Sequence, residues 1–190
     1  MAGKIRLRTF VIALAAVVAT LFSQSTLAYY ATSVTATNVI TSGNINMKIV
    51  EKMNGGADFP EEGVYILPGS IVSKIVTVAN TGLHPFWLRV RLTNGVSNEA
   101  LSADVFDLDI NTKDWIVGDD GYYYYGSILQ PGAATERLFS QVRIAGDIDN
   151  SYAGENLTLT VSAFAVQSEN NPADSPLEVV GWPAENGGKS

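Results

Sequence analysis

Cysteine is absent from this chain of 190 residues. Disulfides, thiol nucleophiles and cysteine-based zinc sites are therefore excluded. Small secreted domains often depend on disulfides, so a domain without them must be stabilised by its core, by association or by bound ions. The length suits one domain with a substantial hydrophobic core.

Histidine is nearly absent as well, since His84 is the only one. It precedes Pro85 between two predicted strands, and we interpret it as a turn or surface residue. A zinc site without cysteine would have to be rich in carboxylates, which is unusual. No His-Glu-x-x-His helix and no Gly-x-Ser-x-Gly elbow is present. We therefore predict no catalytic residue, no cofactor and no metal site.

Pairs of acidic residues are the remaining candidates for chemistry. Asp107 and Asp109 alternate on one face of a predicted strand, where exposure to solvent is the expected state. Asp147 and Asp149 lie in the acidic segment 146–150, which offers hard oxygen ligands for calcium. That segment lacks the distal glutamate of an EF-hand loop, so an acidic turn is the favoured interpretation.

Positive charge is scarce: 12 basic residues stand against 19 acidic ones, a formal net charge of -7. Three of the basic residues (Lys4, Arg6 and Arg8) lie in the first 28 positions, and every acidic residue lies beyond them. The rest of the chain is therefore strongly acidic. Such a surface repels nucleic acids and anionic membranes, so neither is an expected partner.

A hydrophobic run long enough to cross a membrane is missing too. The one apolar stretch, residues 10–22, is short of the roughly 20 residues that a membrane-spanning helix needs. It comes after the basic start and precedes small residues that end at Ala28. This three-part layout predicts a signal peptide over residues 1–28, removed by a signal peptidase, and a secreted protein with no stable membrane anchor.

Alternation of apolar and polar residues dominates the chain beyond residue 28, and no segment there has a sustained helical period. In residues 86–93, apolar side chains alternate with Arg89, Arg91 and Thr93, which predicts a strand with one wet face. A more apolar stretch, 71–78, predicts a central strand. The other strands that we predict are 157–162, 106–110 and, more weakly, 44–52, 122–129 and 135–144. A short helix near 98–104 or 112–114 is an open alternative.

Turn chemistry separates these strands. Asn-Gly, Pro-Gly and Asp-Gly pairs recur, and they supply the backbone angles that tight turns need. Many short strands with frequent turns predict an all-β fold, a jelly-roll-like β-sandwich over residues 29–167. From residue 168 the chain becomes polar and rich in proline and glycine, which predicts a loose, flexible tail over residues 168–190.

Four consecutive tyrosines, residues 122–125, form one unusual motif. In a strand, Tyr122 and Tyr124 point to one face and Tyr123 and Tyr125 to the other. One pair can pack in the core while the other is exposed and free to stack. A plain core strand and an assembly surface are both compatible with the motif.

Several segments together resemble a known family. They are the junction Ala28-Tyr29-Tyr30 with the strand pattern of residues 35–47, the segment 67–82 followed by Arg89-Val90-Arg91, and Trp115 followed by the tyrosine run and residues 129–135. In this order they resemble the TasA/camelysin family, the biofilm-matrix proteins of Gram-positive bacteria that the signal peptidase SipW processes. The resemblance covers roughly residues 1–166 and offers no role for the tail.

The resemblance implies a secreted jelly-roll subunit of extracellular fibres, whose N-terminal strand inserts into the next subunit. The donor strand would be residues 29–40, with Tyr30, Val34, Ala36 and Ile40 on the inserted face. Strand addition gains backbone hydrogen bonds and side-chain burial together, and head-to-tail contacts that do not close build filaments. The expected partners are further copies of the chain, an accessory matrix protein and the signal peptidase.

Two alternatives stay open at this point. Camelysin-type relatives are described as metal-dependent proteases of the cell surface, although the single His84 counts against that activity here. A monomeric sandwich that binds carbohydrate or another surface is the other alternative.

Overall fold

The fold is all-β. The computed structural model describes residues 31–34, 37–42, 44–169 and 171–185, and no α-helix occurs among them. The predicted signal peptide lies outside the described residues. Within these ranges no helix is long and apolar enough to cross a membrane. The strands, in chain order, are β1 (Ala31–Val34), β2 (Thr37–Ser42), β3 (Met47–Lys52), β4 (Val64–Ile66), β5 (Ile71–Ser73), β6 (Ile75–Asn80), β7 (Phe86–Val96), β8 (Phe106–Leu108), β9 (Trp115–Val117), β10 (Tyr122–Tyr125), β11 (Gln141–Ile144) and β12 (Asn156–Gln167).

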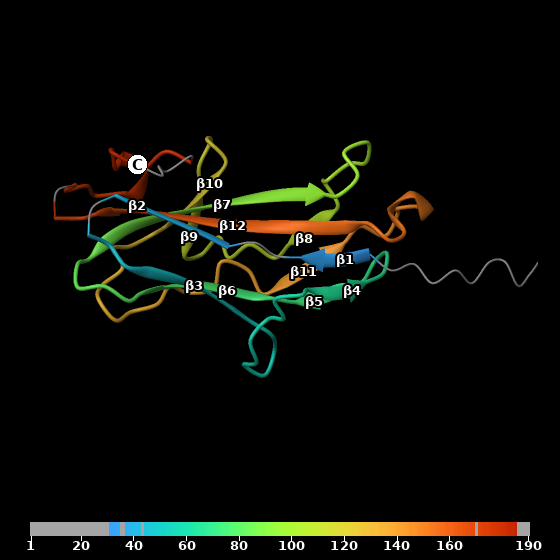
Figure 1. The fold of residues 1–190 in the computed structure, drawn as a ribbon. Helices are drawn as coiled ribbons and strands as arrows, with labels where there is room; N and C mark the ends of the chain where they lie inside the picture. Colours follow the sequence, from blue (N-terminus) through green and yellow to red (C-terminus); the bar gives the residue numbers. More distant parts are fainter. Residues whose placement is uncertain (1–30, 35–36, 43, 170, 186–190) are drawn as a thin grey trace, which may run out of the picture.

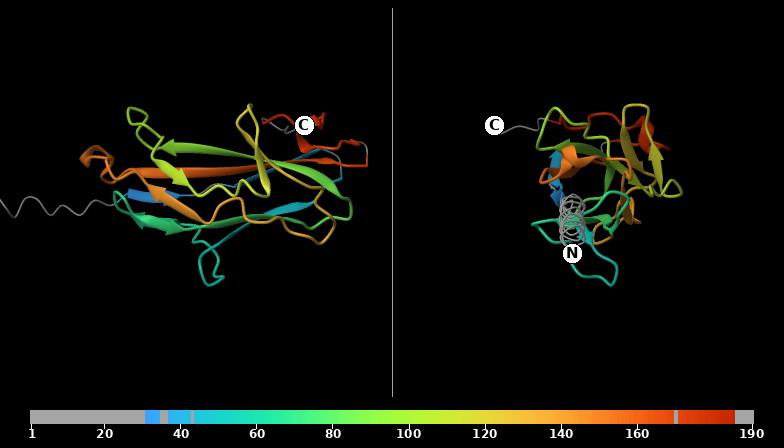
Figure 2. Two further views of the ribbon diagram at one scale, coloured as in Figure 1. Left: turned by 180° about the vertical axis from the view of Figure 1, so that it is seen from behind. Right: turned by 90° about the vertical axis from the view of Figure 1, so that its right-hand side faces the viewer.

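Two layers of strands face each other (Figure 1, and end-on in Figure 2). The first layer has the order β4-β1-β12-β7-β10-β9, and β2 lies beside β12. The second contains β3-β6 and β5-β11-β8. Backbone bonds join these two small sheets: Thr135 N–H donates to Val78 O (2.9 Å) and Val76 N–H to Phe139 O (3.2 Å). The second layer is therefore continuous.

The core fills the space between the layers. Alternate residues of β12 point into it, and Leu157, Val161 and Ala163 are fully buried there. Phe86 and Leu88 of β7 add to the same cluster, opposite residues of β3 and β6. Strand side chains alternate between faces, so the apolar set of each strand packs inward as the sequence pattern predicts.

The strongest strand predictions are confirmed, and several strands are longer or shorter than expected. Residues 86–93 and 157–162 lie in β7 and β12, which pair antiparallel over eleven positions from Leu157↔Val96 to Gln167↔Phe86. The stretch 106–110 is a strand only at Phe106–Leu108. The weaker predictions correspond to β3, β10 and β11, each over fewer residues. The short strands β4 and β9 were not predicted.

The central strand predicted over 71–78 is wrong as a single element. It divides at Lys74 into β5, which pairs with β11, and β6, which pairs with β3. The Lys74 N–H donates instead to Ser140 O at 3.0 Å. The chain changes its pairing partner from β11 to β3 at this position, and both partners lie far away in the sequence.

No helix forms at 98–104 or 112–114, where the chain makes turns. The two short 3-10 helices described are η2 (Asn150–Tyr152) and η3 (Pro176–Glu178). Each begins after a residue whose side chain accepts from the backbone of the first turn: Asp149 from Ser151, and Ser175 from Leu177.

The described part of the tail differs from the loose segment that its composition predicts. Val179 is buried and packs with Trp87 and Val166, beside Trp182. The Trp87 indole N–H donates to Asn171 O at 3.0 Å. The few apolar residues of the tail therefore pack on the outer face of the first layer and hold residues 171–185 against it.

Candidate assembly site

The N-terminal segment lies along β12 in one continuous register. Thr32 pairs with Asn156, Val34 with Thr158, Thr37 with Val161 and Ser42 with Val166, so partners are always 124 positions apart. The pairing is parallel in both β1 and β2. Among the described residues, these two strands therefore share one register along β12, against residues 156–158 and 161–166.

β1 is paired on both edges. Besides its parallel pairing with β12, it pairs antiparallel with β4 through Ala31↔Ile66 and Ser33↔Val64. It thus fills a slot between a strand of the first layer and the short strand β4. β2 continues along β12, and among the described residues β12 is the strand with which it pairs. Figure 1 shows both strands, in blue, running beside β12.

The predicted donor residues fall on this segment, but the structure describes only some of them. Tyr30 and Ala36 lie outside the described residues. Val34 is described by its backbone pairing with Thr158. Ile40 is partly buried and packs against an aromatic cluster on the outer face of the first layer. Its neighbour Val39 points to the opposite face, beside Ala163, and is 46% exposed at the edge of the layer.

The aromatic cluster consists of Tyr122 and Tyr124 of β10 and Phe164 of β12, all buried. The other two tyrosines, Tyr123 and Tyr125, are partly buried and pack against the main core. The alternation predicted for the tyrosine run is therefore correct. Both faces are packed, however, because the tail covers the cluster through Trp182.

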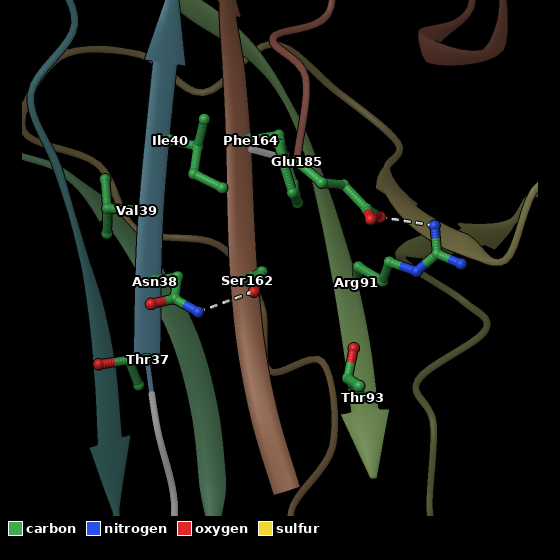
Figure 3. Close-up of a pocket in the computed structure, with 9 residues that line it drawn as sticks. All are labelled: Thr37, Asn38, Val39, Ile40, Arg91, Thr93, Ser162, Phe164 and Glu185. Carbon is green, nitrogen blue, oxygen red and sulfur yellow. Dashed lines mark hydrogen bonds and ion pairs between the residues drawn. The ribbon is translucent and has the colours of Figure 1, made fainter. Parts of the chain in front are cut away.

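A groove of about 580 Å³ lies beside β2 on this outer face. Figure 3 shows β2 on one side of it and Glu185 of the tail on the other. Asn38 donates to the Ser162 hydroxyl at 3.4 Å, and Arg91 donates to Glu185 at 2.6 Å. Hydroxyl, amide and charged groups line the groove, a lining suited to a polar, hydroxyl-rich ligand or to another peptide segment.

The acidic residues play different parts. Asp107 is exposed as predicted, 3.8 Å from Arg143. Asp109 is exposed as predicted too, and it accepts hydrogen bonds from the backbone N–H groups of Ser140 (2.8 Å) and Gln141 (2.7 Å). It fastens the end of β8 to the start of β11. Asp149, in the candidate calcium segment, caps η2 through Ser151.

His84 lies in a turn, with its Nδ1 3.9 Å from a Glu169 carboxylate. The described residues contain no group of three or more His, Cys, Asp or Glu side chains that is arranged to hold a metal ion.

A buried ion pair in the second layer was missed by the sequence reasoning. The Lys74 ammonium lies 2.7 Å from Glu51 Oε2 and 3.9 Å from the centre of the Phe59 ring. Burial lowers the pKa of Lys74, and the hydrogen bond and charge of Glu51 oppose that shift. The only sequence signal is a lysine inside an apolar run, which indicates a strand break or a buried pair.

No family model, curated protein or solved structure matches the chain. The function is therefore inferred from the geometry of the strands and the tail.

Proposed function

We propose that this protein is a secreted, jelly-roll-like subunit of extracellular matrix fibres that polymerises by exchange of its N-terminal strand. The observation that carries the proposal is the single parallel register of β1 and β2 along β12. Partners 124 positions apart are held by long-range contacts alone. The same segment of another copy can therefore make identical contacts, because the site does not distinguish which chain supplies the strand.

Removal of the signal peptide after Ala28 would leave residues 29–42 as a free end ahead of the sandwich. A strand withdrawn from its own β12 opens the slot between β12 and β4. The strand of the next subunit fills the slot and restores the hydrogen bonds and the buried side chains. When the exchange is not reciprocal, each copy donates to one neighbour and accepts from another, and the chain of contacts stays open.

The absence of cysteine allows a direct test. One batch of mature protein carries Asn38→Cys and a second carries Ser162→Cys, two positions joined by a hydrogen bond. After mixing and mild oxidation, a disulfide between the two batches requires a strand from one copy to lie on β12 of another. We expect this bond in the mixture, identified by mass spectrometry of the linked peptides, together with fibres in negative-stain micrographs.

A variant with Leu83→Cys, at a highly exposed turn, replaces Ser162→Cys as the control and should give no defined bond with position 38. Fibres without the 38–162 bond would refute strand exchange. A protein that stays monomeric under all assembly conditions would refute the fibre function.

The polar groove beside β2 supports a second candidate, a surface that binds carbohydrate. Asn38, Thr93, Arg91 and Glu185 offer several donors and acceptors in an open groove, the groups that sugar hydroxyls need. Phe164 at its floor is buried and presents no exposed ring for stacking. Binding of a neutral polysaccharide by a monomer, lost in Asn38→Ala, would favour this candidate over the fibre.

A further inference from the structure

The outer face of the first layer is closed by the tail and not by a second sheet. Trp182 packs edge-on against Tyr124, with ring centres 5.7 Å apart. Tyr122 makes a similar contact with Phe164 at 5.4 Å. Trp182 and Glu185 of the tail contact Tyr124 and Tyr122, and Ile40 of β2 packs against the same cluster. Without that cover, the three rings would form an exposed apolar patch.

An arginine is enclosed within this cover. The Arg89 guanidinium lies 3.8 Å from the centre of the Tyr122 ring and 4.8 Å from that of Trp182. Its Nε is buried without a hydrogen-bond partner among the described residues. A cation removed from water is costly unless compensated, and aromatic faces supply part of that compensation. Asp120 Oδ2 lies 3.6 Å from Arg89 Nη1, which also donates to the Tyr124 hydroxyl at 3.3 Å. Trp182 adds one aromatic wall around this largely buried guanidinium.

Glu185 fastens the described end of the tail. Its carboxylate accepts from Arg91 at 2.6 Å and from the Tyr122 hydroxyl at 2.8 Å. These contacts reach both β7 and β10. The hydrogen bond from Tyr122 and the charge of Arg91 lower the pKa of Glu185, which favours its ionised form.

The N-terminal strand rests on the same cluster. Ile40 of β2 and Trp182 of the tail both pack against the group of Tyr122, Tyr124 and Phe164. In Figure 3, Phe164 lies between Ile40 on one side and Glu185 on the other. Water that enters beneath a displaced tail would reach the ring on which Ile40 packs. The tail and β2 are therefore coupled through a shared packing surface.

We infer that Trp182 and Glu185 form a latch that stabilises the self-paired form of the chain and slows exchange of the N-terminal strand. The inference rests on the proposed function, since it concerns the regulation of that exchange. A latched subunit keeps its strand in its own slot. A subunit whose tail has been displaced, by a partner or by proteolysis, releases the strand more readily and joins a fibre sooner.

The mixed-batch experiment with Asn38→Cys and Ser162→Cys gives the exchange rate, and tail variants are added to both batches. Trp182→Ala and Glu185→Gln are expected to accelerate formation of the 38–162 bond by about three- to tenfold, the scale of a lost cation–π contact or charge-assisted hydrogen bond. Trp182→Phe, which keeps an aromatic ring, should restore much of the parent rate. Val180→Ala is the matched control, because Val180 is in the tail and 71% exposed.

The outcomes distinguish failure of the latch from failure of strand exchange itself. If the parent batches never form the bond, strand exchange itself is wrong. If the bond forms but Trp182→Ala and Glu185→Gln leave its rate unchanged or slower, exchange stands and the latch is refuted. Near-ultraviolet circular dichroism and the thermal midpoint of each variant identify any general loss of folding, which Val180→Ala and Trp182→Phe should not produce.

Discussion

At the scale of single residues, the structure gives exposed and buried charges roles that composition does not reveal. Asp109 belongs to an acidic pair that the sequence treats as solvated, yet two backbone N–H groups converge on it. Partial burial raises its pKa, but the hydrogen bonds from Ser140 and Gln141 outweigh burial and hold the pKa below its ordinary value. The ionised carboxylate is thus a structural acceptor that links β8 to β11.

The stability that Asp109 contributes should therefore depend on pH. A carboxylate whose pKa is lower in the folded state stabilises the fold above its unfolded pKa, and loses that effect as pH falls through the folded pKa. We expect Asp109→Asn to lower the free energy of unfolding by about 1 kcal/mol at neutral pH, the usual worth of such an acceptor. In strongly acid solution the difference should vanish.

Urea unfolding of parent and variant at both pH values measures this effect. Asp107→Asn is the control, because Asp107 is exposed and its ion pair with Arg143 is long, at 3.8 Å. A deficit in Asp109→Asn that stays the same in acid would contradict the ionised-acceptor role.

At the scale of elements, the role of a segment depends on the strand with which it pairs and not only on its own strand pattern. The stretch 71–80 has a strand pattern throughout, but it pairs with β11 before Lys74 and with β3 after it. The N-terminal segment has an equally plain strand pattern. Its importance comes from its parallel partner, which lies at the other end of the chain.

The N-terminal segment should also act as a separate peptide. If strands are exchanged, a synthetic peptide of residues 29–42 added in excess will occupy slots on β12 and shorten the fibres. Ile40→Asp in the peptide should abolish this effect, because a charge would be placed against the aromatic cluster at Tyr122, Tyr124 and Phe164. Val39→Asp is the matched control, since Val39 is largely exposed.

Fibre length distributions from electron micrographs measure the competition. Equal inhibition by the parent, Ile40→Asp and Val39→Asp peptides would indicate a nonspecific effect and contradict the proposed seating of Ile40.

At the scale of the whole molecule, the first and last strands of the sandwich complete each other. β12 lies between β7 and the N-terminal strands, and its inward residues are among the most buried of those that the structure describes. If one edge of β12 were unpaired, its backbone N–H and C=O groups would lose their hydrogen-bond partners, and core side chains would become exposed. Assembly and monomer stability therefore depend on the same segment.

Deletion of residues 29–40 should impair both. We expect the shortened protein to form no fibres, because it has no strand to donate. Its thermal midpoint should fall by on the order of 10 °C, as a loss of about 3 kcal/mol gives in a domain of this size. Calorimetry and sedimentation velocity measure the two effects. Fibres of normal length from the deletion variant would show that the copies associate by another surface.

The sequence by itself predicted the all-β class, the main strands and the placing of Tyr122 and Tyr124 on one face of a strand, because alternation and turn chemistry are local properties of the chain. It also marked residues 29–40 as a strand. Tertiary structure alone decided that this strand runs parallel to β12, that Lys74 divides a strand, and that Trp182 covers Arg89. Each of these joins residues far apart in the chain. Bringing two distant segments together costs chain entropy, and contacts between them must offset that cost. The local sequence pattern of one segment does not say which distant segment supplies those contacts.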